Sequence, residues 1–323
     1  MAPQATLCDL PNELLISILS QLPTRSLLPL VAVSHRFYSL VLRILKQRLK
    51  RVTSSPDLRI FLECYQPALI LSTPFLSCDY LYTDGLDDVA TEEEGEENAP
   101  GSLKATKSLS TTLSGVYSHF RPVVSEENRR GRARPPRRRQ SQQREGEEVA
   151  APEEKEEDTR YAQDVYLGSG ELFSQLCTVT NLVHVGSRPG ILLGHVNVSD
   201  GLIRVWRDWL AARAAEQDCN GEESVLWADA ACTVGVRFRV TEKDIRAEHP
   251  VLVASDEELP VAYRLEFEEL LLRTNTLLVM AERSEVQEPP TEGFTYGARG
   301  LASYPTLYLY FPETAPTGYF MPH

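Results

Sequence analysis

The sequence lacks the short motifs by which most catalytic and metal-binding proteins are recognised. No G-x-S-x-G segment marks a serine hydrolase, "GSGEL" at 168–172 has no P-loop lysine after it, and the six histidines form no H-x-H or H-E-x-x-H motif. The six cysteines are scattered without a C-x-x-C pair, which is typical of reduced thiols in an intracellular protein. We therefore expect no catalytic residue, no metal site and no cofactor.

Net positive charge and long apolar runs are also missing. The formal net charge is −13, which disfavours nucleic acid as a partner because phosphate contacts need a basic surface. The most apolar stretch, residues 58–76, is interrupted by Arg59, Glu63, Pro67 and Pro74, so it cannot span a bilayer. The N-terminal "MAPQATLCDL" lacks the basic region and apolar core of a signal peptide. We expect a cytoplasmic or nuclear protein that does not bind a membrane.

The middle of the chain, residues 84–160, consists of charge blocks. Eight acidic residues fall in 84–97 and eight in 145–158, whereas 129–144 holds eight arginines and no acid. Such blocks repel themselves and bury little apolar surface, so we expect a disordered linker or insert. One segment inside it, 109–124, has enough apolar residues to dock onto a neighbouring domain. The arginine block is either a nuclear-import signal or a solvated run that pairs with the flanking acids, and both interpretations stay open.

The stretch "LCDLPNELLISILSQLP" at residues 7–23 predicts a short amphipathic helix. Pro11 suits the first turn, where its missing N–H costs nothing. Apolar residues then recur at i, i+1, i+4, i+5 and i+8 from Leu14 to Leu22, and Pro23 ends the helix.

Two further helices are predicted directly after it. Ser26 is placed to cap the second, with Pro29 in its first turn, and Ser34 is placed to cap the third, whose apolar face extends to Leu49. Three helices this short have more apolar surface than they can bury among themselves. The surplus indicates that a partner protein covers part of it.

The segment "LPNELLISILSQLPTRSLLPLVAVSHRFYSL", residues 10–40, resembles an F-box. It departs from the family pattern at Ser26, where aspartate is usual, and at Pro29. The resemblance implies docking onto a Skp-type adaptor and, through it, onto the cullin of a ubiquitin ligase. The positions that match the pattern and are expected to contact the adaptor are Leu10, Pro11, Leu14, Leu15, Ile18, Leu19, Leu22, Pro23, Leu27, Leu28, Val33 and Ser34.

Charge supports this interpretation, because residues 1–51 carry seven bases against two acids and would favour an acidic partner. An alternative is that the leucines form a private core against residues 52–76. A second alternative keeps the adaptor contact but makes the chain a scaffold that works without a cullin.

The C-terminal region, residues 161–323, alternates between apolar and polar residues as antiparallel strands do. The clearest runs are "VRFRV", "VAYRLEFEE", "TLLVMAERSEV" and "TLYLYFP". One helix is plausible in "GLIRVWRDWLAARAAEQ" at 201–217, although "LIRVW" could equally be a strand. The expected fold is therefore α+β, with a small three-helix N-terminal F-box and a mainly antiparallel sandwich- or barrel-like domain.

A β-rich domain behind an F-box suggests recognition of a protein substrate. Trp206, Trp209 and Trp227 are the candidate client-binding residues, although tryptophan is more often part of a core. The region also resembles the C-terminal part of uncharacterised fungal F-box proteins, which implies no ligand, and a glycan-binding β-sandwich is an alternative by analogy alone. The expected division of the chain is a tail at 1–6, the F-box at 7–50, a connecting segment at 51–83, the charged linker at 84–160 and the β-rich domain at 161–323.

Overall fold

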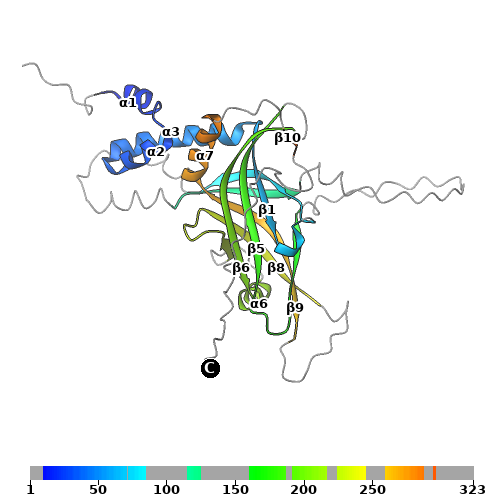
Figure 1. Ribbon diagram of the computed structural model, residues 1–323. Coiled ribbons are helices and arrows are strands. Elements are labelled where there is room, and N and C mark those ends of the chain that lie inside the picture. Colours follow the sequence, from blue (N-terminus) through cyan, green and yellow to red (C-terminus); the bar gives the residue numbers. More distant parts are fainter. Residues whose placement is uncertain are drawn as a thin grey trace, which may run out of the picture.

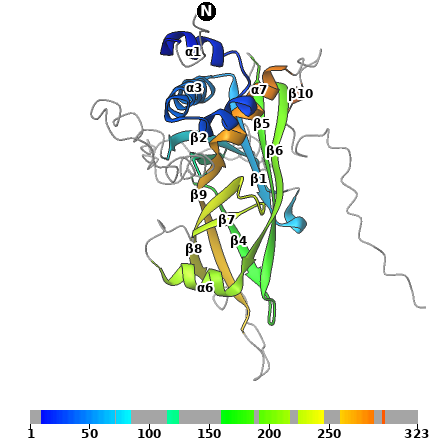
Figure 2. The same ribbon diagram turned by 90° about the vertical axis from the view of Figure 1, so that its left-hand side faces the viewer.

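The structure is a computed structural model that describes residues 10–70, 72–84, 115–124, 160–186, 191–216, 224–244, 259–286 and 294–295. A group of N-terminal helices lies across one end of a strongly curved β-sheet, and a short helix lies at the opposite end (Figures 1 and 2). None of the helices among these residues is long and apolar enough to cross a membrane.

The N-terminal helices follow the proline and serine punctuation of the sequence. Helix α1 begins after Pro11, and α3 begins after Ser34, whose Oγ accepts a hydrogen bond from the Phe37 N–H at 3.2 Å. Pro29 falls in a 3₁₀ turn, where its missing N–H is tolerated. The elements are α1 Asn12–Leu19, α2 Thr24–Leu27, η2 Leu28–Ala32 and α3 His35–Ser54.

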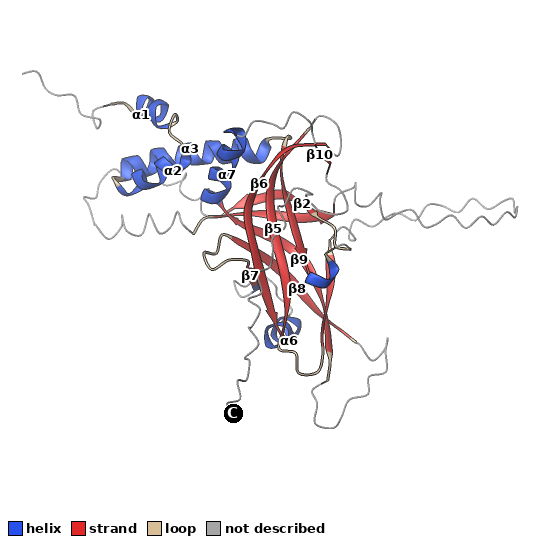
Figure 3. Ribbon diagram, viewed as in Figure 1, coloured by secondary structure: helices blue, strands red, loops and turns tan. Residues whose placement is uncertain are grey.

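The remaining elements are mostly strands, with helices at two connections and a short 3₁₀ turn at a third (Figure 3). Helix α6 directly follows β6, and α7 directly follows β9. The bounds are β1 Leu58–Tyr65, η3 Pro67–Leu69, β2 Leu76–Thr83, β3 Tyr117–Val124, β4 Ala162–Leu167, β5 Phe173–Val185, β6 Ile191–Trp206, α6 Arg207–Ala215, β7 Val225–Trp227, β8 Val234–Lys243, β9 Val261–Arg273, α7 Thr274–Val286 and β10 Phe294–Thr295.

The strands form one antiparallel sheet in the order β10-β6-β5-β1-β2-β3-β9-β8-β7, with β4 also pairing with β9. The sheet curls until its two sides nearly meet. There the Leu202 N–H on β6 donates to the Ala228 carbonyl, which directly follows β7, at 3.3 Å. A Cβ built on Gly201 would lie only 2.3 Å from the same carbonyl oxygen. The result is a nearly closed barrel in which glycine permits the close approach at the seam.

The barrel interior and the N-terminal helices share one apolar core. Inside the barrel, Phe238 and Phe267 meet edge to face with ring centroids 4.9 Å apart, and both are fully buried. Leu277 and Leu278 of α7 belong to the same core and lie between the barrel and α3. The expected α+β architecture with a barrel-like antiparallel domain is confirmed.

Several expected boundaries differ from the structure. The segment expected to connect two domains at 51–83 supplies β1 and β2, which lie in the middle of the sheet. Residues 117–124, placed within the expected linker, form β3 and pair with β2 and β9. The apolar residues within 109–124 indicated that this segment could pack on a domain, but the charged residues around it favoured a linker. Apart from Asp84, the charge blocks lie outside the described residues.

One local assignment is corrected, and one that the sequence left open is decided. "TLLVMAERSEV" is α7 rather than a strand, because its buried residues Leu277, Leu278, Ala281 and Ser284 follow helical spacing. "LIRVW" is the end of β6, and helix begins only at Arg207. "VRFRV" and most of "VAYRLEFEE" alternate as predicted, whereas "TLYLYFP" lies outside the described residues.

Candidate functional site

Helix α1 presents two opposite faces. Leu15 and Leu19 are buried against α3, whereas Leu14 and Ile18 are 52% and 50% exposed. The two exposed residues are four positions apart, so their side chains lie on the same face, one turn above the other. Helix α1 therefore carries an apolar strip that faces solvent.

One more exposed apolar residue, Val33, follows the short helices. Leu27 is fully buried and Leu28 is half-buried, but Val33, between η2 and α3, is 63% exposed. Arg36 fixes α1 on α3 by donating to Asn12 Oδ1 at 2.8 Å and to the Leu10 carbonyl. The exposed apolar residues thus project from a braced group of helices.

Glu282 of α7 joins this helical group to the barrel. Its carboxylate accepts hydrogen bonds from the Thr24 N–H at 2.9 Å and from Thr24 Oγ1 at 2.6 Å. Arg48 of α3 pairs with the same carboxylate at 2.6 Å and also donates to the carbonyls of Ser20 and Leu22. Glu282 therefore caps α2 from a distant part of the chain.

This cap corrects the prediction that Ser26 caps the second helix. The helix begins two residues earlier, at Thr24, and the Ser26 N–H donates to the Pro23 carbonyl. A local sequence pattern could not reveal a cap that comes from α7.

A groove of about 700 Å³ lies beside this junction. Its lining includes Leu22 and Pro23, Arg51 of α3, and Leu278 and Val286 of α7. Val286 is 83% exposed. The candidate surface therefore includes α7 residues that the sequence assigned to a strand.

The residues expected to contact an adaptor divide by burial. Three are buried and serve the core of this chain: Leu15, Leu19 and Leu27. Four are half-buried: Leu10, Leu22, Leu28 and Ser34. Five are exposed and free to meet a partner: Pro11, Leu14, Ile18, Pro23 and Val33.

The three candidate client-binding tryptophans have different surroundings. Trp206 is 46% exposed at the end of β6, with its ring 4.9 Å from that of Phe173. Trp209 is partly buried against the core, and Trp227 is partly buried 5.1 Å from the Tyr117 ring. The three side chains do not form one cluster, and Trp206 is the one most available to a partner.

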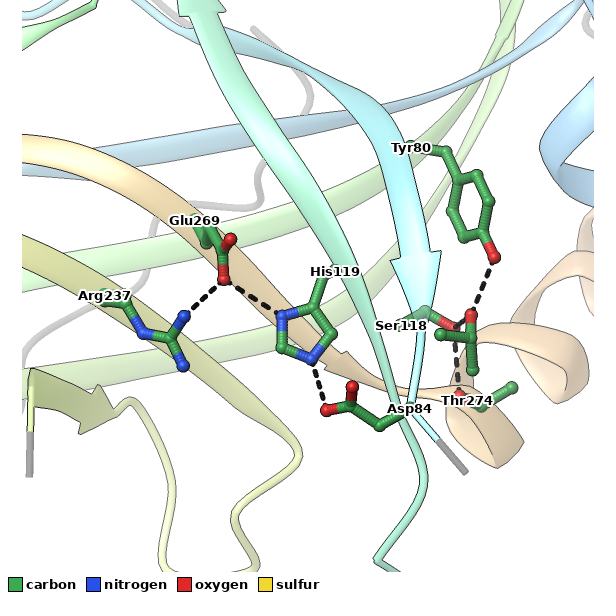
Figure 4. A network of polar contacts seen from close by, with 8 residues as sticks. Tyr80, Asp84, Ser118, His119, Arg237, Glu269 and Thr274 are labelled. Atoms are coloured by element: carbon green, nitrogen blue, oxygen red, sulfur yellow. Dashed lines mark hydrogen bonds and ion pairs between the residues drawn. The ribbon is translucent and has the colours of Figure 1, made fainter. Parts of the chain in front are cut away.

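A buried histidine forms the centre of a polar network on the barrel wall (Figure 4). His119 Nε2 lies 2.8 Å from Asp84 Oδ2, and Nδ1 lies 3.0 Å from Glu269 Oε2. Arg237 donates to the same Glu269 oxygen at 2.6 Å, and the Tyr82 ring stacks on His119 at 4.3 Å. Because both ring nitrogens already face carboxylates, neither is available to act as a base on a substrate. The network braces β2, β3, β8 and β9.

The same figure shows a second chain of hydroxyl groups nearer to α7. Tyr80 Oη lies 2.9 Å from Thr83 Oγ1, which donates to Ser118 at 3.0 Å, and Ser118 in turn lies 2.9 Å from Thr274. Ser118 is fully buried and, among the described residues, bonds to Thr83 and Thr274 rather than to a histidine, unlike an activated nucleophile.

The part of the chain that the structure describes offers no metal site, since no group of three potential ligands occurs there. Cys64, Cys78, Cys177 and Cys232 are all free thiols. Burial raises the pKa of the Cys64 and Cys78 thiols, so both stay protonated and unreactive. The exposed apolar residues of the helices are the stronger candidate for function.

Comparison with protein-family models finds a match to the F-box-like family over residues 7–51. This range covers α1, α2, η2 and most of α3, and it includes the exposed residues Pro11, Leu14, Ile18, Pro23 and Val33. No curated protein matches the chain, and no solved structure does.

Proposed function

We propose that this chain, whose residues 7–51 are an F-box-like domain, is the substrate-recognition subunit of a cullin ubiquitin ligase. F-box domains bind Skp-type adaptors, which generally link them to a cullin. The observation that carries the proposal is the exposure of Leu14, Ile18 and Val33 on helices that are otherwise well packed. Because these side chains are already partly buried, each contributes roughly 1 kcal/mol more when a partner buries the rest.

Charge on the helices supports the same partner. Arg25, Arg43, Lys50 and Arg51 have exposed side chains. They make the surface of the helical group basic, which steers an acidic protein toward it.

The barrel would then hold the client. An adaptor subunit of this kind adds no reacting group of its own; it places a client lysine close to the thioester carried by another subunit. The contacts of Glu282 with Thr24 and Arg48 support this role, because they fix the helices relative to the barrel. A fixed orientation keeps the distance between adaptor and client constant.

The test removes the apolar strip while keeping the fold. The double variant Leu14→Ala, Ile18→Ala should lower affinity for a purified Skp-type adaptor by at least about tenfold, because two anchors are lost. The matched control is Leu69→Ala, Ile70→Ala, which truncates two residues of similar exposure, 40% and 53%, in the connection between β1 and β2. Undiminished adaptor binding by the first variant would refute the assignment.

The ligase role needs a separate readout. A complex purified with the adaptor should recruit the cullin and support ubiquitin transfer to a bound client. Adaptor binding without cullin recruitment would instead indicate a scaffold that works without the ligase.

A further inference from the structure

We propose that the end of the barrel remote from the N-terminal helices carries a docking surface for an acidic, apolar peptide segment of a partner protein. We call it the distal patch, made of Leu172, Phe173, Arg204, Trp206 and Leu259. This proposal depends on the proposed function in one respect: if the chain is a substrate-recognition subunit, the partner at the distal patch is its client.

The position of the distal patch leaves it accessible when the helices are occupied. Strand β5 begins and β6 ends where helix α6 lies, at the opposite end of the barrel from α1 and α3 (Figures 1 and 2). Phe173 pairs with Trp206 across these two strands. A partner bound here would not compete with an adaptor bound to α1.

The apolar residues of the patch are unusually exposed for their size. Leu172, Leu259 and Trp206 are 64%, 49% and 46% exposed, and Phe173 is 36% exposed. The Phe173 and Trp206 rings lie 4.9 Å apart in a tilted arrangement. Tryptophan and arginine dominate the few residues that supply most of the affinity in protein interfaces.

The backbone beneath the patch is held in place before any partner arrives. Arg207 donates from its backbone N–H to the Leu172 carbonyl at 2.8 Å. Its guanidinium donates to the carbonyls of Gly168 at 2.6 Å, Glu171 at 3.1 Å and Leu259 at 3.3 Å. A surface fixed in this way loses less conformational entropy when it binds.

The charge of the patch selects the chemistry of the occupant. The Arg204 guanidinium lies 5.7 Å from the Phe173 ring centre, is exposed, and makes no ion pair with any acid in the described part of the chain. Glu171, in the loop between β4 and β5, accepts from the Gly168 N–H through Oε2 at 2.8 Å. An aspartate or glutamate of the partner can therefore pair with Arg204 while the next apolar side chain meets the two rings.

A protein segment fits these groups better than nucleic acid does. Arg204 is the one positive charge of the patch, and the exposed acids Glu171 and Asp208 lie close to patch residues in the sequence, so the patch cannot follow a phosphate backbone. The occupant is therefore a peptide that places a carboxylate next to a phenylalanine, tryptophan or leucine.

The test selects random dodecapeptides displayed on phage against the immobilised full-length chain. Enriched peptides should carry Asp or Glu next to an aromatic or leucine residue. Trp206→Ala and Arg204→Glu should each weaken the selected peptides by at least about tenfold. Arg204→Glu should also prefer versions in which the acid is replaced by lysine, an exchange that loss of folding cannot produce. Leu69→Ala, Ile70→Ala is the control and should bind as the natural chain does.

Three results would overturn the proposal. The first is enrichment of no peptide above a blank surface. The second is enrichment of peptides that lack acidic residues, or of peptides that bind the Trp206→Ala and Arg204→Glu variants as well as they bind the natural chain. The third is tighter binding by a synthetic peptide of residues 145–158, which would make the chain's own acidic block the occupant. Because the Leu14→Ala, Ile18→Ala variant should keep full peptide binding, failure of the distal patch and failure of the adaptor assignment are distinguishable.

Discussion

At the scale of single residues, the Glu282 carboxylate makes contacts that belong to two parts of the molecule at once. It belongs to α7, yet its hydrogen bonds go to Thr24 and its ion pair goes to Arg48. The Arg48 and Glu282 side chains are only 16% and 31% exposed, so solvent screens this pair less than a surface pair.

Replacing Glu282 should loosen the helices from the barrel. We expect Glu282→Ala to lower the free energy of unfolding by about 2 kcal/mol, because a charge-assisted cap and an ion pair are both lost. Glu285→Ala, an exposed position on the same helix, is the control and should change it by less than about 0.5 kcal/mol. Urea denaturation measures both, and equal effects would mean that Glu282 makes no special contribution.

Asp229 gives the structure a dependence on acid. Partial burial works to raise the pKa of its carboxyl, but hydrogen bonds from Thr233 and Val234, with the Arg273 charge nearby, outweigh burial and lower the pKa below its ordinary value of 3.8. A lowered pKa in the folded state means that the ionised group stabilises the fold above the unfolded pKa. That stabilisation is lost as pH falls through the folded pKa.

We therefore expect Asp229→Asn to be less stable than the natural chain by about 1 kcal/mol at neutral pH, since only the charged part of the bonds is lost. The two melting temperatures should converge as pH falls from about 5 toward 2, where the natural aspartate becomes protonated. Calorimetry across this range measures the convergence. Parallel curves would show that the charge of Asp229 does not contribute.

At the scale of elements, the seam between β6 and the end of β7 depends on Gly201. A Cβ there would meet the Ala228 backbone at 2.3 Å, so the two segments must move apart. We expect Gly201→Ala to cost about 1–3 kcal/mol and to speed hydrogen exchange at the Leu202 amide. Gly194 lies on the same strand with nothing within 4 Å of an added Cβ, so Gly194→Ala should leave the seam unchanged. Similar exchange in both variants would show that the seam opens without this contact.

The sequence predicted elements well where one periodicity dominated. Val236, Phe238 and Val240 alternate, and each is buried in β8. The sequence-based prediction was wrong at α7, because a short apolar run fits a strand as well as a helix until the burial of its residues is known. It also failed at β3, because eight residues of strand stand in a segment whose average composition is that of a linker.

The candidate site was predictable only in part, because periodicity identifies apolar residues but not which of them are buried. Helical spacing identified the apolar residues of α1, but it could not divide Leu14 and Ile18 from Leu15 and Leu19. That division depends on where α3 lies. Trp206 stands out from the other tryptophans only once the barrel end is known, and Glu282 could not be linked to Thr24 without the fold.

At the scale of the whole molecule, the helices and the barrel are continuous in their apolar interior. Leu45 of α3, Leu277 of α7 and Phe238 of the barrel belong to one cluster of buried residues. A shared core couples the stability of its parts.

We therefore expect the helices and the barrel to unfold together. Tryptophan fluorescence reports the barrel side, since the three tryptophans are at 206, 209 and 227. Helical circular dichroism reports mainly the N-terminal helices, because α1, α2 and α3 hold most of the α-helical residues that the structure describes. The two signals should give coincident thermal transitions. Loss of the helical signal at a lower temperature would show that the N-terminal domain folds independently.

The separation between Thr24 and Glu282 has a further consequence for synthesis of the chain. The two residues are 258 positions apart, so the ribosome completes the N-terminal helices long before it makes the residue that caps α2. At translation rates of about 5–20 residues per second, that interval lasts roughly 10–50 s. During this interval the exposed strip of α1 is already made, but the barrel that will fix the helices is not. An adaptor that binds the nascent chain would therefore meet helices that are not yet fixed in orientation.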